Sequence, residues 1–84
     1  MSIRDDIDTE KIAEAALAIL CLTAFRDDPV MRAWKGMDWD LMDMLYERGW
    51  IRDPKGKAKS VIVTDEGVEK AEQFLQRHFA KNST

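Results

Sequence analysis

Few side chains in this sequence have the chemistry that catalysis requires. Its 84 residues include one cysteine, Cys21, and one histidine, His78. Cys21 stands inside the apolar run AEAALAILCLTAF, which is typical of a small core residue rather than a nucleophile. His78 is close to the C-terminal end of the last predicted helix, where a charged imidazole interacts favourably with the helix dipole. Because neither residue belongs to a Ser/His/Asp or Cys/His pattern, we predict no enzymatic activity and no cofactor.

Three carboxylates of the second full helix have a helical spacing. Asp40, Asp43 and Glu47 fall on one side of a helix. They could hold a divalent cation if other oxygen ligands joined them, but the sequence supplies no matching second set. A solvated helix face is the alternative that we favour, so we predict no metal site.

A short basic segment stands out against an acidic chain. Residues 52–59 contain four positive side chains and only Asp53 as an acid, a net charge of +3, whereas the whole chain has a net charge of −3. These positive residues could contact phosphate or an acidic partner. Alternatively, they form a solvated turn that keeps an exposed strand edge from pairing with other chains, and we favour this interpretation. The residues concerned are Arg52, Lys55, Lys57 and Lys59.

Large apolar side chains gather between residues 31 and 50, where all three tryptophans occur together with four methionines. Tryptophan and methionine are enriched where proteins meet partners. The alternative, that a thin domain uses large side chains to fill its core, stays open. The predicted protein interface comprises Ile19, Leu22, Trp34, Trp39, Met42 and Tyr46.

A first helix should begin near Asp8 or Thr9, either of which can cap it. Apolar residues then occupy every side of this helix, and a helix that is apolar all round must be covered all round. Because 84 residues offer little material for that cover, we predict a homodimer with this helix partly in the interface.

Residues 26–38 form the predicted connector to a second helix. Pro29 can open a single helical turn with Asp28 as its cap, as the remnant of a short helix. The next full helix is capped by Asp38 and closed by Gly49. The segments WIRD and SVIVT then predict a β-hairpin, with Ile51 and either Val61 or Ile62 toward the core.

The last helix is predicted to begin at Thr64. Its expected buried face is Val68, Ala71, Leu75 and Phe79, flanked by Phe74 and His78. The predicted fold class is therefore mainly α with a small β-hairpin (α+β). Its order of helix, short turn or helix, helix, hairpin wing and helix is winged-helix-like.

Length and composition limit the chain to one domain, residues 1–84, with 1–7 and 80–84 frayed. Apolar residues make up 45% of the chain and charged residues 35%, which is typical of a folded, soluble domain. The apolar run of the first helix is too short to cross a bilayer, and the charged, mostly acidic residues before it lead us to expect no signal peptide. We therefore expect a cytoplasmic protein without membrane contact.

The segment ERGWI, followed by a basic turn and VIVTDEG, resembles the wing region of bacterial winged-helix regulators. In those proteins the helix before the glycine reads DNA. Over nearly all its length, however, the chain resembles an uncharacterised family of small bacterial proteins with the motif RAWKG-x-DWD followed by GKAKSV-x-x-T-x-EG. The matching segments are IDTEKI and RAWKGMDWDLMDMLYERGWIRDPKGKAKSVIVTDEG. This second resemblance implies a compact bacterial domain and no particular activity.

The charge of residues 38–48 bears on the choice between two functions, protein–protein contact and DNA binding. In residues 38–48, four acidic side chains stand against Arg48 alone, so a helix in the place of a DNA-reading helix would be repelled by phosphate. We therefore expect a small, non-catalytic bacterial domain that acts as a homodimer through protein–protein contacts. The alternative is a winged-helix DNA-binding transcriptional regulator that contacts phosphate through its basic wing.

Overall fold

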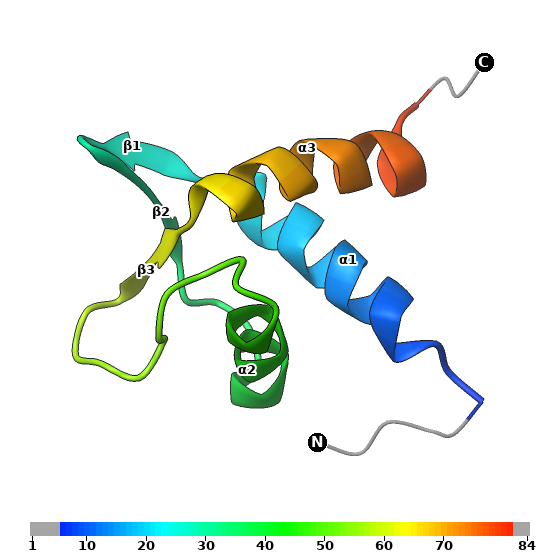
Figure 1. Cartoon of the computed structure of the whole chain (residues 1–84), viewed down its shortest axis with the longest axis horizontal. Coiled ribbons are helices and arrows are strands. Elements are labelled where there is room, and N and C mark those ends of the chain that lie inside the picture. Colours follow the sequence, from blue (N-terminus) through cyan, green and yellow to red (C-terminus); the bar gives the residue numbers. More distant parts are fainter. Residues whose placement is uncertain (1–5, 82–84) are drawn as a thin grey trace.

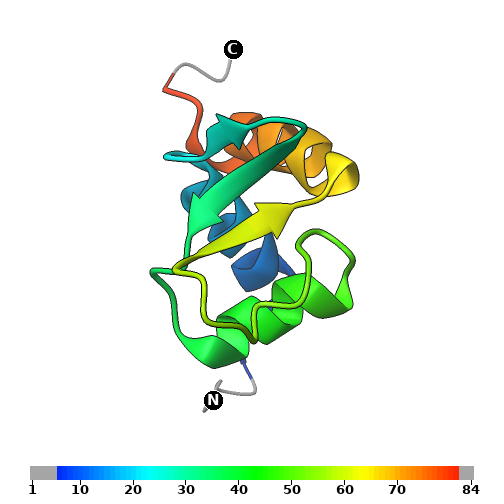
Figure 2. The same ribbon diagram turned by 90° about the vertical axis from the view of Figure 1, so that its left-hand side faces the viewer.

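A computed structural model describes residues 6–81 of the chain. Three helices lie on one side of an antiparallel sheet with the strand order β1-β2-β3 (Figures 1 and 2). The predicted α+β class is confirmed, whereas the predicted frayed ends lie largely outside the described residues. The elements in order are α1 (Thr9–Cys21), β1 (Phe25–Asp27), β2 (Val30–Trp34), α2 (Trp39–Glu47), β3 (Ser60–Val63) and α3 (Asp65–Phe79).

Helix α1 is the centre of the molecule. It begins as predicted at Asp8, whose carboxylate accepts hydrogen bonds from the backbone N–H groups of Glu10 and Lys11. It packs against α3, α2 and β2 of the same chain (Figure 1). The expectation that one chain cannot cover this helix was therefore wrong for most of its length. Only its C-terminal end leaves large apolar side chains exposed, those of Ile19 and Leu22.

The segment before α2 is a β-hairpin, and the predicted helical turn at Pro29 was wrong. Asp28 and Pro29, joined by a cis peptide bond, form the two-residue turn between β1 and β2. In β2, Ala33 points into the core while Trp34 is exposed, the alternation of a half-buried strand. Strand β2 also pairs with β3, about 30 residues later in the chain. That long-range partner overrides the local helix-start signal of Asp28 and Pro29.

Helix α2 has the predicted ends. The Asp38 carboxylate accepts a hydrogen bond from the N–H of Asp40 at 3.1 Å. Gly49 has a φ of +79°, the left-handed conformation that favours glycine after a helix. The N–H of Gly49 donates to the Tyr46 carbonyl and that of Trp50 to the Leu45 carbonyl, so the helix ends in a Schellman motif.

The predicted hairpin of WIRD with SVIVT is only partly formed. Ile51 makes an isolated bridge to Val63, and the N–H of Arg52 donates to the Ile62 carbonyl at 2.9 Å. The ladder stops there because Pro54 has no N–H to donate and its side chain is buried. Residues 52–59 form a loop, and β3 takes β2 as its main partner.

A set of short contacts joins the start of α3 to the end of α2. We name it the Gly49–Gly67 clasp; its residues are Gly49, Trp50, Thr64 and Gly67. The N–H of Thr64 donates to the Trp50 carbonyl at 3.0 Å. The Thr64 hydroxyl lies 2.7 Å from the Gly49 carbonyl oxygen and accepts from the Gly67 N–H at 2.9 Å, so it caps α3 as predicted. A Cβ atom at Gly67 would lie 2.0 Å from the Trp50 carbonyl oxygen, so this position excludes any side chain.

The clasp also sets which side of α3 is buried. With Gly67 against Trp50, the innermost stripe contains Gly67, Ala71 and Phe74, four and then three residues apart. The prediction placed Phe79 on the buried face, but its side chain is 50% exposed, and Phe74 takes the core position instead, with its ring 5.3 Å from that of Trp50.

Replacing Gly67 by alanine tests the clasp. In an ordinary helical position this change stabilises a protein, because alanine has the higher helix propensity. At Gly67 we expect the free energy of unfolding to fall by about 2 kcal/mol or more, because the backbone of Trp50 cannot yield as a flexible side chain would. Urea denaturation of the two proteins measures the difference.

Gly56→Ala is the matched control. Apart from Gly56 itself and its two chain neighbours, no atom lies within 4 Å of the position that a Cβ would take there, so its effect should stay within about 0.5 kcal/mol. Equal effects of the two substitutions would contradict the close approach at Gly67.

Candidate functional site

Cys21 and His78, the two residues whose side chains could take part in catalysis, both have a structural role in the fold. Burial raises the pKa of the Cys21 thiol to about 11, so the reactive thiolate is scarce at neutral pH. The His78 ring nitrogen Nε2 lies 2.7 Å from Glu14, and the guanidinium of Arg77 lies 3.1 Å from the same carboxylate oxygen. These contacts join α3 to α1.

The carboxylates of α2 do not gather into a metal site. Among residues 6–81, no group of three or more potential ligands is placed to hold a metal ion. Asp40 and Asp43 are half-buried and Glu47 is exposed. Across the same described residues, no helix is long and apolar enough to span a bilayer.

The residues predicted to form a protein interface are exposed, with one exception. The exposed fractions are 65% for Leu22, 56% for Trp34 and 51% for Ile19. Trp39 and Tyr46, seven residues apart on one side of α2, are also about half exposed. Met42 is 1% exposed and belongs to the core, because it lies on the side of α2 that faces the other elements.

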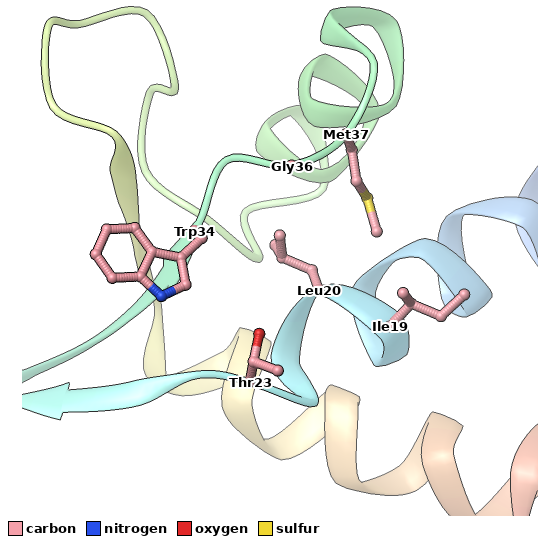
Figure 3. Close-up of a pocket in the computed structure, with 6 residues that line it drawn as sticks. All are labelled: Ile19, Leu20, Thr23, Trp34, Gly36 and Met37. Carbon is pink, nitrogen blue, oxygen red and sulfur yellow. The ribbon is translucent and has the colours of Figure 1, made fainter.

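Two of the predicted residues, Ile19 and Trp34, meet at the end of α1. A surface pocket of about 170 Å³ lies between the last turn of α1 and the segment that leaves β2 (Figure 3). Ile19 and Trp34 border it on opposite sides, with Leu20 and Met37 between them. Leu22 follows Ile19 by three residues and therefore continues the same apolar end of the helix.

The outer face of the sheet extends this region. Figure 2 looks onto the sheet with α1 and α3 behind it, and in the described part of the chain no helix lies in front. Trp34 stands on this face with its ring 5.0 Å from that of Phe25 in β1. Val30 and Ile62 are half-buried residues of the same face. Arg32, which the register pairs with both Phe25 and Ile62, lies on this face too, and its Nε donates to the Ser60 hydroxyl at 2.9 Å. We name the whole region the α1–sheet surface, comprising Ile19, Leu22, Phe25, Val30, Trp34, Met37 and Ile62.

The predicted basic residues are exposed on the loop. Within residues 6–81, no ion pair joins Arg52, Lys55, Lys57 or Lys59 to an acidic side chain. The structure adds Lys35 to this group, since its Nζ lies 3.3 Å from the carbonyl oxygen of Gly56 in the loop.

Five residues of these surfaces were absent from the sets predicted from the sequence: Phe25, Val30, Met37 and Ile62 on the α1–sheet surface, and Lys35 beside the basic loop. Phe25 and Met37 join the α1–sheet surface only because residues 25–34 form a hairpin, which the local signals did not predict. Lys35 joins the basic loop through the pairing of β2 with β3. Its place between Trp34 and Trp39 was the available signal, because basic and aromatic residues alternate there.

Comparison with known proteins identifies the family. A family model described as "Domain of unknown function (DUF6429)" matches residues 8–81, which include both surfaces. The chain belongs to this family. It is similar to "Uncharacterized protein y4hR" of Sinorhizobium fredii, with 45% identity over 76 residues that cover 90% of this chain and 99% of that protein. No solved structure matches the chain significantly. The predicted resemblance to an uncharacterised family of small proteins is confirmed.

The Glu14 contacts generate a pH-dependent contribution to stability. The hydrogen bond from His78 lowers the pKa of Glu14, and the nearby charge of Arg77 acts in the same direction. A carboxylate with a depressed pKa in the folded state contributes stability above its unfolded pKa and loses it as the pH falls through the folded value. We therefore expect Glu14→Gln to lose about 1 kcal/mol at neutral pH and to be less sensitive to acid than the wild type.

Denaturation curves between neutral and strongly acidic pH measure this effect. The control is Glu72→Gln on the exposed side of α3. If the stability of Glu14→Gln declined with acid as steeply as that of the wild type, the assigned role of Glu14 would be wrong.

Proposed function

We propose that this domain has no catalytic role and acts through protein contacts, with a second copy of itself as the partner on the α1–sheet surface. The observation that supports this most strongly is the exposure of three large apolar side chains, each more than half exposed: Ile19 and Trp34, which line one pocket, and Leu22 at the same end of α1. Exposed apolar patches of this kind mark interaction sites.

A second copy suits this surface because a projection and a hollow lie next to each other. The Trp34 indole stands beside the pocket that is bordered by Ile19 and Met37. In a two-fold dimer each chain presents the same patch, so a side chain of one copy can enter the pocket of the other while its own pocket is filled in return. An indole is also the side chain most enriched at the centre of interfaces.

The area required shows how far the interface must extend. A stable interface buries about 800 Å² on each partner, roughly one seventh of the 5926 Å² that this chain exposes. The end of α1 alone is too small for that. The contact must therefore continue onto the open sheet face with Phe25 and Ile62. Pairing of the β1 edges is disfavoured, because this strand has three residues and two of them are the charged Arg26 and Asp27.

Leu22→Lys tests the proposal. Leu22 is 65% exposed, so the substitution should leave the free energy of unfolding of a monomer nearly unchanged while placing a charge in the contact. We expect the wild type to sediment as a dimer at tens of micromolar and Leu22→Lys to dissociate at least tenfold more readily.

The control is Phe79→Lys, the same kind of change at an exposed apolar residue that also ends a helix but lies outside the α1–sheet surface. A monomeric wild type under these conditions, or equal dissociation of the two variants, would overturn the proposed dimer.

A further inference from the structure

A second surface combines lysine side chains with an exposed indole. The loop of residues 52–59 exposes Lys55, Lys57 and Lys59. Lys35, between β2 and α2, is attached to this loop twice. Its backbone N–H donates to the Lys59 carbonyl at 2.9 Å, and its Nζ donates to the Gly56 carbonyl at 3.3 Å.

Lys35 also connects the loop to the first residue of α2. Its Nζ lies 5.9 Å from the centre of the Trp39 ring, within the range of a cation–π contact. Trp39 nevertheless stays 54% exposed. The indole and the loop lysines therefore belong to one continuous surface, which we name the Lys–Trp39 surface: Lys35, Trp39, Lys55, Lys57 and Lys59.

This combination suits one class of ligand better than its competitors. Single-stranded nucleic acids are bound by positive charges that follow the phosphates and by aromatic rings on which bases stack. A duplex hides the faces of its bases, and the acidic residues of α2 would oppose its entry. An acidic peptide would use the lysines but supplies no planar ring for the indole.

We propose that the Lys–Trp39 surface binds single-stranded nucleic acid, with phosphates against Lys55, Lys57 and Lys59 and one base stacked on Trp39. Asp38 and Asp40 stand next to Trp39 in the sequence, so the phosphates must follow the side of the indole that faces the loop. The proposal does not depend on the dimer, because none of these side chains belongs to the α1–sheet surface.

Fluorescence polarisation of labelled oligonucleotides tests this site. The probes are oligo(dT) and oligo(rU) of about 15 nucleotides, together with a DNA duplex of the same length. We expect both single strands to bind more tightly than the duplex, and the difference between them shows whether DNA or RNA is preferred. Three lysine–phosphate contacts predict affinity that falls roughly ten- to twenty-fold between about 50 mM and 200 mM salt.

Two pairs of variants separate this site from general charge and general aromatic effects. Lys57→Glu should weaken binding and make it less sensitive to salt, whereas Lys11→Glu, the same change in net charge at an exposed residue of α1, should not. Trp39→Leu should weaken binding by roughly five-fold or more through the loss of stacking. Tyr46→Leu, seven residues later on the same side of α2, should leave binding unchanged.

Several results would overturn the proposal: no binding of single strands at low salt, equal or tighter binding of the duplex, or equal effects of Lys57→Glu and Lys11→Glu. Binding of poly-glutamate with the same affinity and no response to Trp39→Leu would also overturn it and assign the surface to acidic peptides. Leu22→Lys changes the α1–sheet surface only, so it should bind single strands as the wild type does. A failure of the nucleic-acid proposal can therefore be told apart from a failure of the proposed dimer.

Discussion

The approach of α3 to the backbone of Trp50 is the constraint on which the rest of the structure depends. Gly67 has no room for a side chain there, and Thr64 contacts both Gly49 and Trp50 while it caps α3. These contacts fix the position of α3 relative to the end of α2. They also turn Ala71 and Phe74 into the core, where α3 packs against α1.

The clasp gives the segment ERGWIRDPKGKAKSVIVTDEG a structural explanation. Its glycines and threonine are required by the left-handed residue after α2 and by the close packing at the start of α3. The likeness to a DNA-reading wing therefore reflects the local geometry of helix, chain reversal and helix. What precedes α2 differs, because the β1–β2 hairpin occupies the place of a short helix.

Local signals in the sequence predicted the parts of the fold that depend on neighbouring residues. Asp8, Asp38 and Thr64 cap their helices as expected, because each cap is completed within three residues. The β1–β2 hairpin was missed because β2 is stabilised by β3, which no local pattern could indicate. Similarly, the cover of α1 depends on which face of α3 turns inward, and Gly67 decides that through a contact with a residue 17 positions away.

The same distinction applies to the candidate sites. The exposure of the loop lysines could be predicted from residue type. That of Leu22 and Trp34 could not, because the sequence left a place in the core open as the alternative, and the structure decides it and adds their neighbours. The hairpin brings Phe25 against Trp34, and the β2–β3 pairing brings Lys35 to the basic loop. The pairing of the three strands thus assembles both surfaces. One is the apolar surface at the end of α1, and the other is the basic, aromatic surface at the start of α2.

Self-association through the α1–sheet surface is the central proposal, and a dilution series followed by nuclear magnetic resonance tests it most directly. It predicts that the indole N–H signal of Trp34 and the amide signals around Ile19 and Leu22 shift with protein concentration, while those of loop 52–59 do not. Spectra that stay unchanged on dilution from a monomeric sample, or shifts confined to another surface, would contradict it.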